Sequence, residues 1–184
     1  MQASSKFSKF IEKETYFLTV RKPLYVAVSQ TVCGCCGKTT PVACLASNNF
    51  SYFDYSSNEN DDNLYWIKSN EFSFFSSVKN ISRELWNILR IKFPYYSVYF
   101  QKDCGGRVWA NNCTHCKNIF EDFQLHSIKG EAFWPYNEKS CEEIILVEIP
   151  VKNEIEISAC FEWSSYDEII MERANKYELI EVLV

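Results

Sequence analysis

The sequence predicts a single α+β domain over residues 1–184, with an antiparallel sheet, two main helices and a zinc-ribbon-like site. Three observations lead to this fold class. Several short segments alternate apolar and polar residues, as half-buried strands do, and two longer segments repeat apolar residues every three or four positions, as helices do. Two distant C-x-x-C pairs offer four thiols to one metal ion. With 47% hydrophobic residues, a chain of 184 residues can bury a sizeable core.

The first strand-like segment leads into the first cysteine pair. Leu24, Val26 and Val28 alternate with the residues between them, which is typical of a half-buried strand. Pro23 interrupts this run and suggests a sheet edge or a bend. Residues 39–45 predict a short returning strand, so that the cysteines stand at the tip of a hairpin.

A second hairpin is expected beside the other cysteine pair. Residues 95–102 predict a strand, residues 103–106 a turn, and residues 107–111 the returning strand. Because each pair then lies next to a hairpin, cysteines that are far apart in sequence can converge. The remaining extended segments are expected at 120–134, 143–149, 155–161 and 179–184.

Two segments predict the main helices. The longer one covers residues 78–92, with Ser76 or Ser77 as its N-cap. The second begins at a capping box formed by Ser165 and Glu168 and continues to about Lys176. The apolar residues of the longer helix fall on one stripe, namely Val78, Ile81, Leu85 and Ile88.

Two polar stretches are expected outside the packed fold. Residues 1–14 predict a mobile or helical lead-in, and residues 54–63 predict an exposed acidic loop. A calcium loop is a less favoured interpretation of residues 54–63, because they lack the glycine and the terminal glutamate of an EF-hand.

The two cysteine pairs predict one shared metal site. Cys33 and Cys36 form the first knuckle (residues 33–36), and Cys113 and Cys116 form the second knuckle (residues 113–116). Four thiolates at this spacing suit tetrahedral Zn²⁺, whose Zn–S bonds are about 2.3 Å long. The sequence therefore predicts a structural zinc ion as the cofactor.

Both knuckles carry a turn residue and a spare ligand. Gly37 and Asn118 tolerate the positive φ that a tight turn often needs. Cys35 and His115 lie inside the knuckles, and either could replace one of the four cysteines as a ligand.

Other interpretations of the cysteines remain open at this stage. The pairs could be buried free thiols or a redox dithiol, since C-x-x-C spacing can lower a thiol pKa. Disulfides are less favoured, because nothing in the sequence indicates export and nine cysteines cannot all pair. Four cysteines outside the knuckles are predicted not to bind metal: Cys44, Cys104, Cys141 and Cys160.

The knuckles and their flanks resemble a group of uncharacterised bacterial proteins. In that group a C-x-x-C knuckle precedes a Thr-Pro-Val strand, here Thr40-Pro41-Val42. A distant knuckle reads Asn-x-Cys-x-His-Cys, here residues 112–116, and an aromatic-Leu-His segment follows, here residues 123–126. The resemblance implies a zinc-stabilised domain of bacterial origin, and it implies no activity.

The sequence predicts a cytoplasmic protein without membrane contact. No apolar run approaches the roughly 20 residues that a membrane-spanning helix needs. The first residues lack the apolar region of a secretory signal. Nine cysteines without an export signal favour a reducing compartment.

Acidic residues concentrate in the last part of the chain. Residues 138–184, the acidic block, carry 4 basic and 12 acidic side chains, whereas the whole chain has a net charge of −5. Such a block repels nucleic-acid phosphates and attracts basic proteins, although surface charge also serves solubility alone. The glutamates expected to meet a partner are Glu142, Glu143, Glu148, Glu154 and Glu156.

Three function classes can be compared. Catalysis is disfavoured, because no nucleophile elbow, phosphate loop or H-E-x-x-H motif is present and four cysteines would close the metal's coordination. Zinc ribbons often bind nucleic acid, and the aromatic residues could stack on bases, but the acidity opposes this alternative. We therefore expect a protein-binding module with a basic partner. An immunity protein that neutralises a basic toxin would fit, by analogy between classes.

Overall fold

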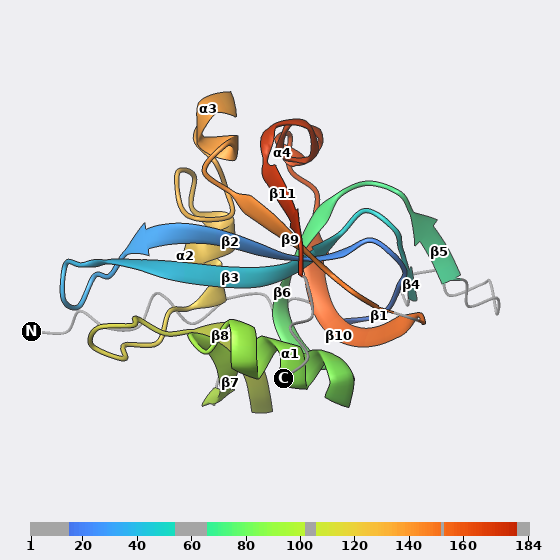
Figure 1. Ribbon diagram of the computed structural model, residues 1–184, viewed down its shortest axis with the longest axis horizontal. Coiled ribbons are helices and arrows are strands. Elements are labelled where there is room, and N and C mark those ends of the chain that lie inside the picture. The colour runs from blue at the N-terminus through green and yellow to red at the C-terminus, as the bar shows by residue number, and fades with distance from the viewer. Residues whose placement is uncertain (1–14, 54–65, 102–105, 152, 180–184) are drawn as a thin grey trace, which may run out of the picture.

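The centre of the structure, a computed structural model, is a strongly curled sheet of nine strands (Figure 1). The structure describes residues 15–53, 66–101, 106–151 and 153–179. Its strands are β1 (Tyr16–Val20), β2 (Leu24–Val32), β3 (Thr39–Ser47), β4 (Phe50–Phe53), β5 (Trp66–Ser69), β6 (Ser73–Asn80), β7 (Tyr96–Gln101), β8 (Gly106–Asn111), β9 (Ile145–Ile149), β10 (Ile155–Glu162) and β11 (Asn175–Glu178). Its helices are α1 (Arg83–Lys92), α2 (Asp122–Ser127), α3 (Glu138–Cys141) and α4 (Asp167–Arg173).

Strands distant in sequence lie side by side in this sheet. The order is β11-β9-β2-β3-β6-β10-β1-β4-β5, and β7 pairs with β8 in a separate hairpin. Neighbouring strands of the large sheet are antiparallel, except that β11 runs parallel to β9. The sheet thus joins β1, near the start of the described residues, to β10 and β4, so the first and last parts of the chain share one framework.

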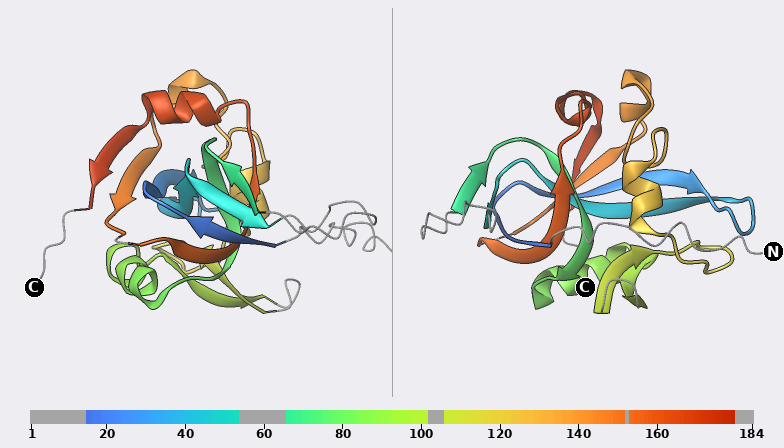
Figure 2. Two further views of the ribbon diagram at one scale, coloured as in Figure 1. Left: turned by 90° about the vertical axis from the view of Figure 1, so that its right-hand side faces the viewer. Right: turned by 180° about the vertical axis from the view of Figure 1, so that it is seen from behind.

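Strands β2 and β3 are covered on both faces. On one face Val26 and Leu45 share a core with Leu85 of α1 and with the β7–β8 hairpin. On the other face Ala27 and Cys44 share a second core with α2, α3 and α4. In Figure 1 α3 and α4 lie above β2 and β3, α2 overlaps the two strands, and α1 and the β7–β8 hairpin lie below. Seen from behind, α2 crosses in front of the two strands (Figure 2, right). The prediction of a half-buried strand at 24–28 was therefore wrong about burial, because apolar residues on both faces are covered.

The predicted α+β class with two main helices was wrong. The structure is 47% strand and 18% helical, and α1, the longest helix among the described residues, has 10 residues. Part of the reason is that residues 120–134, expected as extended chain, contain α2, whereas the expected second helix is short and gives way to β11. The antiparallel sheet and the two hairpins that carry the knuckles were predicted correctly.

The helix predicted at residues 78–92 begins five residues later in the structure, at Arg83. Residues up to Asn80 belong to β6, which pairs with both β10 and β3. Ser82, and neither Ser76 nor Ser77, caps α1, since its side chain accepts a hydrogen bond from the N–H of Leu85. Val78 of the strand and Leu85 of the helix are buried in the same core, so one apolar stripe continues from a strand into a helix and conceals the boundary.

The second predicted helix, α4, is shorter in the structure than the sequence predicts. The capping box predicted for Ser165 and Glu168 was wrong, because Tyr166 is the N-cap of α4 and its side chain forms no cap hydrogen bond. Ahead of the helix, the Ser164 N–H and hydroxyl both donate to the Asp167 carboxylate. The helix ends at Arg173, and residues 175–178 form β11 beside β9. The strand predicted at 179–184 is not tested, because residues 180–184 lie outside the described residues.

Several other sequence predictions also fall on residues that the structure does not describe. These are the lead-in at 1–14, the acidic loop at 54–63, most of the turn at 103–106, and Cys104. Within the described parts of the chain, no helix has the length and apolar character to cross a bilayer.

Candidate metal centre

The two knuckles are the tips of two hairpins that meet at one end of the molecule. The first knuckle joins β2 to β3, whose register is continuous up to Val32 opposite Thr39. The second knuckle follows β8 and is closed by a bridge between Asn112 and Ile119. At the left of Figure 1 the β2–β3 tip lies close to the loop that follows β8. The fold therefore delivers four cysteines from distant sequence positions to one place.

The two knuckles repeat the same backbone turn. In each knuckle, the N–H of the first cysteine donates to the carbonyl of the residue five positions later. The N–H of the residue four positions later donates to the carbonyl of the first cysteine. These hydrogen bonds join Cys33 to Lys38 and Gly37 at 2.9 and 2.7 Å, and Cys113 to Asn118 and Lys117 at 2.8 and 3.0 Å. The matched pattern indicates that each hairpin places its two sulfurs in the same way.

A left-handed residue occupies the same position of both turns. Gly37 has a φ of +69° and Lys117 a φ of +64°. The prediction for Gly37 was confirmed, whereas in the second knuckle the left-handed residue is Lys117 and not Asn118. Aligning the sequences of the two knuckles would have predicted the left-handed backbone of Lys117, because Lys117 follows Cys113 by four positions, as Gly37 follows Cys33.

Exchanging residue types at these two positions should shift stability in opposite directions. A Cβ on Gly37 would meet no atom within 4 Å, so Gly37→Lys should cost only the strain of left-handed backbone, about 1 kcal/mol. Lys117→Gly removes that strain and should stabilise the metal-loaded protein by up to about 1 kcal/mol. Chemical denaturation of the metal-loaded variants measures both changes. Shifts of the same sign would contradict this account.

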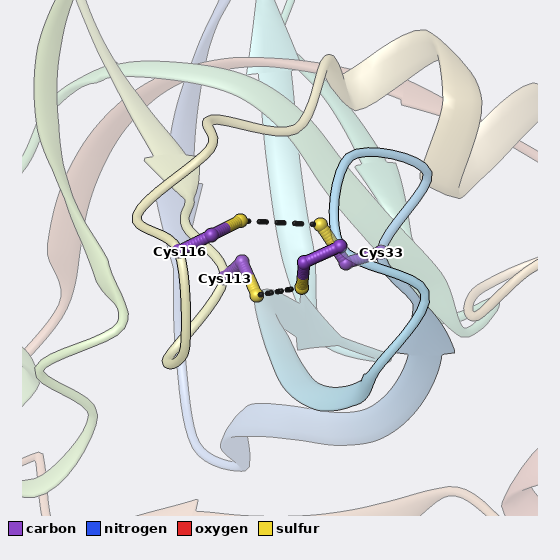
Figure 3. Close-up of side chains that lie close together, drawn as sticks. Cys33, Cys113 and Cys116 are labelled. Carbon is purple, nitrogen blue, oxygen red and sulfur yellow. Dashed lines mark hydrogen bonds between the residues drawn. The ribbon is translucent and has the colours of Figure 1, made fainter.

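The four knuckle sulfurs lie within bonding range of a common centre. Cys33, Cys36, Cys113 and Cys116 offer Sγ atoms that all lie within 4.8 Å of one another. The Sγ atoms of Cys33 and Cys116 are 3.6 Å apart, and those of Cys36 and Cys113 are 3.7 Å apart (Figure 3). Metal–sulfur bonds of about 2.3 Å imply tetrahedral S···S distances of about 3.8 Å, whereas a disulfide needs about 2.05 Å. The arrangement therefore suits a metal ion and not disulfides.

The electrostatics of the cluster differ between its sulfurs. Burial opposes ionisation of Cys113, but the backbone N–H groups of Cys116 and His115 and the thiols of the first knuckle donate to its sulfur, so its pKa falls to about 6. At Cys116 the backbone N–H of Asn118 favours the thiolate, but burial and the three neighbouring thiols raise its pKa to about 12. The cluster thus forms one thiolate readily, and a bound cation is needed to stabilise four thiolates together.

Side chains behind the knuckles fix the two hairpins to each other. The buried amide of Asn111 accepts from the N–H of Ala43 at 2.7 Å and donates to its carbonyl at 2.8 Å, as a neighbouring strand would. Closer to the sulfurs, the N–H of Thr114 donates to the hydroxyl of Thr40 at 3.0 Å. The sequence alone predicts no such contact for these side chains, because only the packing of β3 against the second hairpin shows what an asparagine and two threonines contact.

The spare ligands lie outside the cluster of sulfurs. His115 is turned away, with Nε2 donating to the carbonyl of Thr39 at 3.1 Å, and Cys35 is exposed and does not belong to the cluster. Among the described residues, the four knuckle cysteines are the one group of ligand side chains that could hold an ion. Three of the cysteines predicted not to bind metal are buried elsewhere: Cys44, Cys141 and Cys160.

The predicted partner-binding glutamates do not form one surface. Glu142 contacts Arg173 at 3.4 Å near α3 and α4, and Glu143 is exposed in the same turn. Glu148 is partly buried on β9, opposite Tyr25. Only Glu154 and Glu156 come together, at an open groove of about 520 Å³ that we call the β1–β10 groove, lined by residues 17, 19, 80–82 and 154–158.

Comparison of the chain with protein-family models, curated proteins and solved structures gave no match. The function is therefore argued from the chemistry of the four-cysteine cluster and from the surface around Glu154 and Glu156.

Proposed function

We propose that this chain is a zinc-stabilised protein-binding module, in which one zinc ion holds the two knuckles together and an acidic surface meets a basic protein. The observation that carries the proposal is the closed set of four thiols within 4.8 Å. A zinc ion with four protein ligands has no open position for water or substrate, which is the pattern of structural and not of catalytic zinc.

Zinc is the metal that the ligands favour. An all-thiol tetrahedral site selects zinc or iron, and hard cations such as Mg²⁺ and Ca²⁺ require oxygen ligands. Backbone N–H groups that donate to Cys113 and Cys116 spread the negative charge of the thiolates, as hydrogen-bond donors to metal ligands do. A colourless protein with a four-thiolate cobalt spectrum after exchange would support zinc, and iron absorption in the purified protein would contradict it.

Zinc binding should release protons and weaken in acid. At Cys36 the backbone N–H of Lys38 favours the thiolate, but burial and neighbouring thiols raise its pKa, and the pKa of Cys116 is about 12. Both thiols are protonated at neutral pH and must lose their protons to bind the metal, so affinity should fall as pH falls. Calorimetric titration in buffers of different ionisation enthalpy measures this release. Binding without proton release, or zinc well below one equivalent per chain, would count against the site.

The protein-binding part of the proposal is supported by charge. Glu154 and Glu156 are both exposed at one groove, and such carboxylates steer a cationic partner and repel phosphates. Poly-lysine and a DNA duplex are suitable probes at moderate salt. We expect salt-sensitive binding of poly-lysine that the pair Glu154→Lys and Glu156→Lys weakens more than the pair Glu168→Lys and Glu172→Lys. Tight DNA binding would favour the alternative, a nucleic-acid-associated zinc ribbon, over a protein partner.

The immunity-protein form of this role stays a prediction. It adds to the proposed function a toxin as the basic partner, whose surface should carry clustered lysine or arginine side chains.

A further inference from the structure

The β1–β10 groove has its own chemical character. It runs over the outward side of β1 and β10 and ends against the residues that lead from β6 into α1. Its apolar part includes Phe17, which is 54% exposed although it lies within a strand, and Ile81. Its polar part includes Thr19 and Ser158. Glu154 and Glu156 are the charged side chains among its lining residues, so its lining is negative.

The two carboxylates differ in their present partners. Glu154 accepts a hydrogen bond from Nε of Arg21 at 2.6 Å, and the side chains of this pair are 57% and 35% exposed. Glu156 forms no ion pair within the described part of the chain, and it stands on β10 directly opposite Thr19 of β1. Among the described residues, the groove therefore holds one carboxylate without an ion pair and one that an arginine already neutralises.

The spacing of the two glutamates matches an extended chain. Glu156 lies on β10, and Glu154 directly precedes the first residue of that strand, Ile155. Residues two apart in extended chain point to the same side and lie about 6.5 to 7 Å apart, and both glutamates line the groove. A partner segment in extended conformation presents its own alternate side chains at the same interval. Lysine or arginine at two alternate positions would face Glu154 and Glu156, and an apolar side chain between or beside them would meet Phe17, since exposed aromatic residues often anchor such contacts.

We propose that the β1–β10 groove binds an extended segment of a partner protein that carries lysine or arginine at alternating positions. The proposal rests on the protein-binding function above and names the surface and the chemistry of the partner. Arg21 then acts as a competitor inside the chain, because its guanidinium occupies Glu154 in the same way as a cationic side chain of the partner would.

A short fluorescent peptide of alternating lysine and valine tests the proposal by fluorescence anisotropy with the zinc-loaded protein. Glu156→Gln should weaken binding roughly tenfold, the scale of one partly buried charge pair. Arg21→Gln should tighten binding roughly fivefold, because it frees Glu154. Two matched variants change the same charges elsewhere: Glu172→Gln on α4, and Arg173→Gln, which frees Glu138 and Glu142. Neither should change the affinity more than about twofold.

The outcomes separate this inference from the proposed function. Equal effects of Arg21→Gln and Arg173→Gln, or an unchanged affinity after Glu156→Gln, would overturn the groove as the binding surface. Binding of poly-lysine without binding of the alternating peptide would also overturn the groove, and it would leave the proposed function standing. Absence of binding to both cationic probes would contradict the proposed function itself. A lower affinity after Phe17→Ser, with an unchanged melting temperature, would support the apolar contact.

Discussion

Cys113→Ser is expected to abolish stable zinc binding and to unfold the end of the molecule that carries both knuckles. Cys113 is fully buried, and hydrogen bonds to its sulfur lower the pKa of its thiol to about 6. Structural zinc sites contribute about 10–16 kcal/mol of binding free energy in small domains, which equals or exceeds the net stability of about 5–15 kcal/mol of a typical protein. Zinc content and the thermal melting temperature should both fall, and a chelator should give wild-type protein the same low melting temperature.

Cys35→Ser is the matched control for this prediction. It makes the same chemical change within the first knuckle, but Cys35 is exposed and does not belong to the four-sulfur cluster. Zinc content and melting temperature should stay at the wild-type values, and His115→Ala should behave likewise. If Cys35→Ser lost the metal, or if Cys113→Ser kept one equivalent with unchanged stability, the assignment of the four ligands would be wrong.

Asn111→Ala is expected to destabilise the zinc-loaded protein by roughly 2 to 4 kcal/mol. The buried Asn111 amide satisfies both the N–H and the carbonyl of Ala43, and each of these backbone groups costs about 1–3 kcal/mol when left buried without a partner. Because the contact also fixes the second hairpin against β3, zinc affinity should fall together with the free energy of unfolding. Chemical denaturation and competition with a chromophoric chelator measure the two effects.

Asn118→Ala separates this role from a general effect of replacing asparagine near the knuckles. The Asn118 side chain is exposed and donates to the carbonyl of its neighbour Ile119. It should change stability by less than about 0.5 kcal/mol, as surface substitutions usually do. Equal losses for Asn111→Ala and Asn118→Ala would remove the contact with Ala43 as the explanation.

More of the candidate site than of the fold could be predicted from the sequence, for a physical reason. The pattern of four cysteines and the glycine after the first knuckle are local signals, and metal geometry leaves few ways to combine them. Asn111, Thr40 and Thr114 gave no such signal, because their roles depend on which hairpin packs against which strand. Lys117 was missed for a different reason: its left-handed backbone follows from the matching turn and not from its residue type.

The fold departed from its prediction where pairing over long distances overrode local preference. Residues 78–80 continue an apolar stripe into α1, yet they pair with β10, whose sequence position is about 80 residues away. Residues 120–134 were predicted to be extended because their aromatic residues favour strands, but residues 122–127 fold as α2 over the second core. Strands β2 and β3 were recognised because their hairpin is local, and their burial on both faces depends on helices much later in the chain.

The position of the two knuckles in the chain has a consequence for the unfolded state. The bridging sulfurs are separated by 83 residues for Cys33 and Cys116, and by 77 residues for Cys36 and Cys113. A bound ion therefore closes the chain between the two knuckles into a ring, and the segments before and after it become two tails. Strand β2, in the first tail, pairs with β3, which lies in the ring. If the ion stays bound on unfolding, ring closure should reduce the chain entropy that folding must overcome by about 4 to 5 kcal/mol, as a disulfide enclosing a loop of similar length would.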